Sequence, residues 1–169
     1  YSAGYASYLS DIGLQQDSWD IWDNDMPVSN VKDKDIVGYK YFGFGGLDKD
    51  TKGLKAFKGT EPGTETSFNL FLRPRTDKEF KVNIMLDGPW ENNVWNGKKI
   101  GEIIVPANST QEVTKFSVNV SEYVDNLDKK NAIYLVAQGN SEVLVDYIGL
   151  GFSSKDKELN RPIVPKVSI

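Results

Sequence analysis

The sequence predicts an all-β fold, an antiparallel β-sandwich, and three observations lead to this prediction. Aromatic residues make up 12 % of the 169 residues, and glycine occurs fifteen times. No apolar period of 3.6 residues is sustained over three turns, whereas several runs alternate apolar and polar residues, as half-buried strands do. Seven or more short strands without intervening helices indicate two packed sheets.

The elements follow one another as short strands separated by turns. Residues 1–34 are polar with interspersed aromatic residues, and we expect them to supply edge strands. Strand-like runs then occur at 35–44, 68–72, 80–86, 100–105, 116–120, 133–138 and 143–152. The clearest run, 80–86, has one fully apolar face, formed by Phe80, Val82, Ile84 and Leu86.

Two segments differ from this strand pattern. Residues 121–127 read as a helix of one or two turns capped by Ser121, and we expect it to be a connector. Residues 153–169 are charged at first and then contain two prolines, so this tail is predicted to be a linker or an additional edge strand. The predicted organisation is one sandwich domain at 1–152 followed by the tail.

Composition excludes several classes of function. The net charge is 20 − 24 = −4 and no basic cluster stands out, which argues against a nucleic-acid partner. No apolar run approaches the roughly 20 residues of a membrane span. Without cysteine or histidine the chain cannot build a Ser-His triad, a His-ligated zinc or a thiolate site. The remaining options are carboxylate-pair chemistry, Lys or Tyr chemistry, and an oxygen-ligated cation such as calcium.

The segment 87–97 (DGPWENNVWNG) is the most conspicuous candidate site. Its two indoles, Trp90 and Trp95, lie among Asp, Asn and Gly rather than inside an alternating strand. An indole offers a flat apolar face to a sugar ring, while the amides of Asn92 and Asn93 can bind its hydroxyls. These four residues are the predicted ligand-binding set. The competing interpretation is that both indoles fold back and cap the sandwich.

A second aromatic and acidic segment spans residues 17–25. It places Trp22 and Trp19 among four carboxylates. Its functional interpretation is a sugar or cation site to which Trp22 would contribute, and the alternative is a strand with solvated acids. The spacing of the acids does not match an EF-hand loop.

Asp146 is the third candidate. Simple alternation through 143–152 places it on the face of Leu144, Ile148 and Leu150, which directs a carboxylate at the core. A buried carboxylate needs partners. Either backbone donors with Arg73 or Arg75 provide them, or Asp146 ligates a structural cation.

No pair of facing carboxylates can be nominated among the 24 acids, so glycosidase activity is not predicted. A small sandwich offers a shallow site, which favours binding without turnover.

Several motifs in order resemble the family 6 carbohydrate-binding modules. The motifs cover most of the chain: DIVGYKYFGFG at 35–45, FLRP at 71–74, VNIMLDGP at 82–89, GKKIGEIIVP at 97–106, IYLV at 133–136 and VDYIGL at 145–150. The resemblance implies a galactose-binding-like jelly roll, a structural calcium ligated by Asp146, and sugar bound by loops at the edge of the sandwich. Modules of this family are appended to secreted glycoside hydrolases, which implies an extracellular, cell-surface or periplasmic location.

Two positions depart from the family pattern. The family has a Trp where this chain has Gln111, Glu112 and Val113, and an Asn where it has Leu144. A sugar site would therefore have to be built from the candidates at 90–95 or from Trp22.

The resulting expectation is a noncatalytic module that binds polysaccharide or oligosaccharide and is attached to a catalytic domain. The alternative is a structural accessory sandwich that packs on a catalytic domain and binds no sugar.

Overall fold

The computed structural model describes most of the predicted sandwich. The described residues are 3, 6–10, 15–16, 27–42, 67–92, 94, 96–124 and 131–153. The predicted tail beyond residue 153 and the segment 17–25 lie outside these residues.

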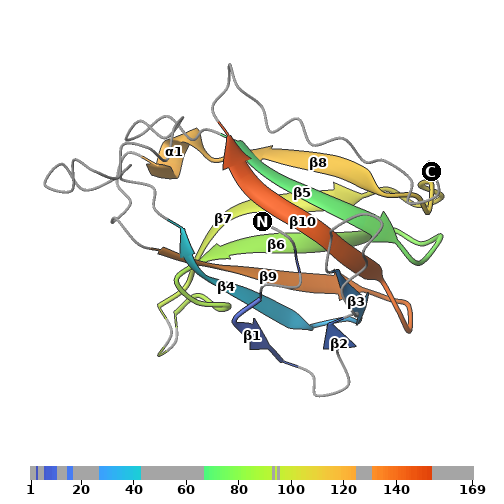
Figure 1. Ribbon diagram of the computed structural model, residues 1–169, viewed down its shortest axis with the longest axis horizontal. Helices are drawn as coiled ribbons and strands as arrows, with labels where there is room; N and C mark the ends of the chain where they lie inside the picture. Colours follow the sequence, from blue (N-terminus) through green and yellow to red (C-terminus); the bar gives the residue numbers. More distant parts are fainter. Residues whose placement is uncertain are drawn as a thin grey trace, which may run out of the picture.

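Two five-stranded sheets make up the fold (Figure 1). The first sheet has the order β1 (Tyr8–Leu9), β4 (Ile36–Phe42), β9 (Asn131–Gly139), β6 (Phe80–Leu86) and β7 (Lys98–Val105). The second has the order β2 (Gln15–Gln16), β3 (Val28–Val31), β10 (Val145–Ser153), β5 (Ser67–Pro74) and β8 (Thr114–Asn119). Every pairing between these strands is antiparallel. The all-β sandwich prediction is therefore confirmed.

The core lies between the sheets and is built by the alternating strands. The apolar faces of β6 and β5 both enter one buried cluster, which contains Val82, Ile84, Leu70 and Leu72. Alternation explains this arrangement because every second side chain of a strand points to the same face. Leu135 of β9 belongs to the same cluster.

The predicted strand positions agree with the structure, and β6 has the predicted bounds, Phe80–Leu86. The short helix α1 (Ser121–Val124) begins where the connector was expected. The first 34 residues contribute β1 and β2, which lie at the edges of the two sheets, and β3, which lies one place inside.

Burial on the outer face of the first sheet was not predicted. A second apolar cluster lies there, formed by Ile36, Met85, Ala132, Tyr134 and Val136. Residues 131–137 are buried throughout, so β9 is covered on both faces. Gly38 allows this packing, since a Cβ at that position would lie 2.6 Å from the ring of Tyr134.

The edge strands β7 and β8 lie close to each other across one side of the sandwich. A Cβ on Gly101 of β7 would lie 2.7 Å from Cγ1 of Val118 in β8. Glycine is required for this approach. In the parts of the chain that the structure describes, no helix has the length and apolarity to cross a membrane.

Candidate functional site

The loop between β6 and β7 is held together at its base. The backbone amide of Gly97 donates to the carbonyl of Trp90 at 2.9 Å. A Cβ on Gly97 would lie 2.2 Å from the carbonyl oxygen of Gly88, so only glycine fits there. Asp87 ties the same base to β9, because its carboxylate accepts hydrogen bonds from the backbone amide of Ala132 at 3.1 Å and from Nδ2 of Asn131.

This loop presents two apolar side chains to solvent. Trp90 is 46 % exposed and Val94 is 94 % exposed. An indole that capped the sandwich would be shielded by the protein, so the capping interpretation does not describe Trp90.

The amides of the loop have a second explanation besides sugar binding. Asp87, Asn92 and Asn96 adopt left-handed backbone angles, with φ of 63°, 56° and 52°. Asn and Asp tolerate this conformation better than other residues with a Cβ. Turn geometry therefore accounts for part of the Asp and Asn content, while Asn92 remains exposed beside Trp90.

Three predicted ligand-binding residues lie outside the described residues: Asn93, Trp95 and Trp22. Their role stays a prediction.

Asp146 is buried, as predicted, but it points away from the core. Val145 and Tyr147 belong to the main core cluster, and so does Leu150. The register of β10 against β5 shifts between Tyr147 and Gly149, where a bulge interrupts the alternation. The predicted face for Asp146 is therefore wrong, because counting back from Leu150 crosses this bulge. Asp146 lies on the outer face of the second sheet with 2 % exposure.

The carboxylate of Asp146 is surrounded by donors from two other strands. Nη1 of Arg75 lies 3.1 Å from each carboxylate oxygen, and the backbone amide of Asn30 donates to Oδ1 at 2.9 Å. Nη1 of Arg73 lies 3.6 Å from Oδ2. We call Asp146, Arg75, Arg73 and Asn30 the Asp146 cluster. It corresponds to the first of the two predicted alternatives, arginine with backbone donors.

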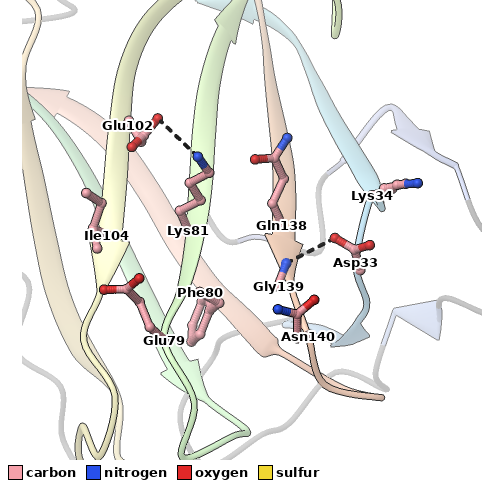
Figure 2. Close-up of a pocket in the computed structure, with 10 residues that line it drawn as sticks. All are labelled: Asp33, Lys34, Glu79, Phe80, Lys81, Glu102, Ile104, Gln138, Gly139 and Asn140. Carbon is pink, nitrogen blue, oxygen red and sulfur yellow. Dashed lines mark hydrogen bonds and ion pairs between the residues drawn. The ribbon is translucent and has the colours of Figure 1, made fainter.

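A polar hollow of about 390 Å³ opens on the outer face of the first sheet (Figure 2). Figure 2 shows Lys81 and Gln138 side by side on β6 and β9, with Glu102 reaching toward Lys81 from β7. The lining residues are Asp33, Lys34, Glu79, Phe80, Lys81, Glu102, Ile104, Gln138, Gly139 and Asn140. Its volume falls within the range of about 300–1,000 Å³ that is typical of small-molecule sites.

Charge pairing shapes one wall of this hollow. Glu102 accepts a hydrogen bond from Nζ of Lys99, which lowers the pKa of Glu102 below its ordinary value. Lys81 adds an ion pair at 4.0 Å. The only aromatic residue in the lining, Phe80, is 2 % exposed, so the hollow offers polar groups but no aromatic platform.

Sequence reasoning missed this hollow. Its polar residues come from segments far apart in the sequence, such as Asp33, Lys81 and Gln138. The sequence signal that could have indicated the hollow is the alternation of polar residues in β6 and β7, which predicts that Lys81 lies on the outer face.

No family model matches the sequence, and no curated protein matches it either. Solved structures do match. A family 6 carbohydrate-binding module of Clostridium stercorarium, described in complex with cellobiose, is 17 % identical with a TM-score of 0.61 and covers 92 % of both chains. A family 6 module of Clostridium cellulolyticum, in complex with xylose, is 21 % identical with a TM-score of 0.61, covering 90 % of this chain and 95 % of the other.

This chain has the fold of the family 6 carbohydrate-binding modules. The family resemblance seen in the sequence is thus confirmed at the level of fold. A carbohydrate-binding module called CBM36, described in complex with calcium and xylotriose, also matches, with 10 % identity and a TM-score of 0.53 over 90 % of this chain and 98 % of the other.

The described residues of this carbohydrate-binding-module fold do not fit a calcium ion at Asp146. Calcium takes six to eight oxygen ligands at about 2.3–2.6 Å. Asp146 is instead surrounded by nitrogen donors, two of them cationic. Among the described residues, no three acidic side chains are grouped to hold a metal ion.

The two family positions that differ in the sequence also differ in their environment. Leu144 is fully buried in the core, where it packs near Gly139 and cannot offer a hydrogen bond to a ligand. Gln111 and Glu112 are exposed and carry no aromatic ring. At the two positions that the sequence resemblance assigns to the family's cleft, this chain thus has neither a Trp nor an Asn.

Proposed function

We propose that this chain is a noncatalytic carbohydrate-binding module whose sugar platform is the indole of Trp90. One observation supports this proposal above the others: Trp90 is 46 % exposed on a loop whose base is fixed by hydrogen bonds and by the close contact at Gly97. A platform held in place before binding loses little freedom when a ligand arrives. Structures with this fold that are described with bound cellobiose or xylose agree with a sugar ligand.

The chemistry of the loop suits a pyranose ring. The indole provides a flat apolar surface for the C–H face of the sugar, and the exposed side chain of Asn92 lies two residues away to bind hydroxyl groups. Asn93, Trp95 and Trp22 are the further candidates that we propose for the same role. The expected binding is weak, because a surface loop shields little of its ligand from water.

The polar hollow is the second candidate location. Gln138, Asn140 and the charged side chains around them could bind sugar hydroxyls, but no exposed ring lies among them. The hollow begins at Phe80, at the opposite end of β6 from the loop. Six residue steps of a strand span about 20 Å, so one small sugar cannot occupy both places. Separate substitutions can therefore distinguish them.

We further propose that the module is attached to a glycoside hydrolase outside the cytoplasm. Its family resemblance supports this, since such modules are appended to secreted hydrolases. Tethering would raise the effective concentration of the catalytic domain at its polysaccharide.

A second candidate function is a structural accessory sandwich that binds no sugar. The observation that favours it is the buried Leu144, which replaces a polar residue of the family's usual cleft.

Isothermal titration of the 169-residue chain against xylan, β-glucan, galactan and mannan tests the proposal. We expect heat with at least one glycan, about a tenfold loss of affinity for Trp90→Ala, and little change for Val94→Ala, the control on the same loop. No heat with any glycan would leave the accessory sandwich as the function. Unchanged affinity in Trp90→Ala together with a loss in Gln138→Ala would move the site to the hollow.

A further inference from the structure

We infer that the guanidinium of Arg75 takes the place of a structural calcium at Asp146, so that the sandwich folds independently of divalent cations. The inference concerns stability and goes beyond the proposed sugar binding. Four features of the Asp146 cluster support it: the position of the guanidinium, the local charge, the strands that are joined and the fixed orientation of Arg75.

Nη1 of Arg75 is placed symmetrically at the carboxylate of Asp146. It is 3.1 Å from Oδ1 and 3.1 Å from Oδ2 of Asp146, and equal distances place it on the plane that bisects the carboxylate. A cation bound by both oxygens would also lie on that plane. The remaining side of Oδ1 faces the backbone amide of Asn30 at 2.9 Å. The guanidinium therefore lies close to both of the oxygens that a bidentate metal would need as ligands.

The Asp146 cluster contains more cations than anions. Arg75 and Arg73 contribute two guanidinium cations, whereas Asp146 contributes one carboxylate. Both guanidinium groups lie within 3.6 Å of the same carboxylate. The cluster is thus already positive, and a divalent cation added to it would be repelled.

The Asp146 cluster joins three neighbouring strands of the second sheet. Asp146 lies on β10, Arg73 on β5, Arg75 immediately after it, and Asn30 on β3. A metal ion that joins loops and strands would provide the same connection by ligation. Here hydrogen bonds and ion pairs provide it from side chains that belong to the chain itself.

A second contact, with the side chain of Asn30, orients Arg75. Its Nη1 also lies 3.3 Å from Oδ1 of Asn30, which has a left-handed backbone with φ of 62°. The guanidinium is therefore held between two side chains, on the same nitrogen that faces Asp146. Its side chain is 39 % exposed, so the cation keeps part of its hydration while it neutralises a carboxylate that is 3 % exposed.

Thermal unfolding of the 169-residue chain with calcium chloride and with EDTA tests the inference. We expect the same Tm in both conditions and no heat when calcium chloride is titrated into the chain. This readout needs no glycan, so its outcome is separate from that of the sugar titrations.

The variant Asp146→Asn decides between outcomes. A calcium-dependent rise in Tm that is lost in Asp146→Asn would overturn the inference, because Asp146 would then be a ligand. A rise of equal size in the variant would place calcium at another site, and it would also overturn the inference, because the sandwich would then depend on a divalent cation. Should Asp146→Asn fail to fold, an EDTA-induced fall in the Tm of the unmodified chain overturns the inference, and an unchanged Tm supports it.

Discussion

The Asp146 cluster and the β6–β7 loop differ in the exposure of their central residue: the first buries a charge and the second exposes an aromatic ring. Asp146 is a charged residue that is 2 % exposed, and its oxygens are satisfied by partners from other strands. Trp90 is a large aromatic residue that is 46 % exposed, and its carbonyl accepts a backbone hydrogen bond from Gly97. Removing a partner of a buried charge destabilises the fold, whereas removing an exposed ring changes binding if the ring is the sugar platform that we propose. Substitutions in the first region should therefore change stability, and those in the second should change binding.

The largest expected effect follows removal of Arg75. Arg75→Met leaves the buried carboxylate of Asp146 with only the backbone amide of Asn30 and the more distant Arg73. We expect the free energy of unfolding to fall by about 1–3 kcal/mol, measured by urea denaturation, with sugar affinity unchanged. The control is Arg73→Met: the side chain of Arg73 is 44 % exposed, so its removal should cost less than about 1 kcal/mol. Equal losses in both variants would contradict the central role of Arg75.

An intermediate effect is expected at the base of the loop. Asp87→Ala removes the acceptor for Ala132 and Asn131 and places a residue with a Cβ but no polar group at a φ of 63°. We expect a loss of about 1–2 kcal/mol in unfolding free energy together with weaker sugar binding, because the platform loses its support. Asp87→Asn keeps an acceptor oxygen and tolerance for the left-handed backbone, so both losses should be smaller. Full affinity in Asp87→Ala would show that Trp90 does not depend on this base.

The smallest effect concerns the ion pairs around Glu102. The side chain of Glu102 is 26 % exposed, between buried Asp146 and exposed Trp90. Lys99 lowers the pKa of Glu102 in the folded protein, so the stabilisation is complete above the ordinary pKa near 4.5 and is lost as the pH falls through the lower folded value. The side chains of Lys99, Lys81 and Glu102 are 26–43 % exposed, which limits the contribution to about 0.5 kcal/mol. Urea denaturation should show Glu102→Gln less stable than the original chain at neutral pH and equally stable well below pH 4.5. A constant difference at both pH values would mean that the charge of Glu102 is not responsible.

Local patterns predicted most of the fold because each strand carries its own alternation. Residues 80–86 contain the complete signal for β6, and the structure has the same bounds. The neighbours of Trp90 left exposure and capping as two alternatives, and the structure has the indole 46 % exposed. The orientation of Asp146 could not be obtained in this way, since the bulge beyond Tyr147 is set by pairing with β5. The hollow could not be predicted from local patterns either. Its lining depends on long-range contacts, such as the hydrogen bond from the backbone amide of Gly139 to Asp33, 106 positions away.

The hydrogen bond from Asn30 to Asp146 has a consequence for the kinetics of folding. It connects residues 116 positions apart, and closing a loop of that length has a high entropic cost unless intervening structure already exists. We therefore expect the contact to form after the rate-limiting barrier, late in the sequence of folding events. Interactions that are absent from the transition state slow unfolding and leave the folding rate almost unchanged. The Asp146 cluster would then act as a latch that lengthens the lifetime of the folded molecule.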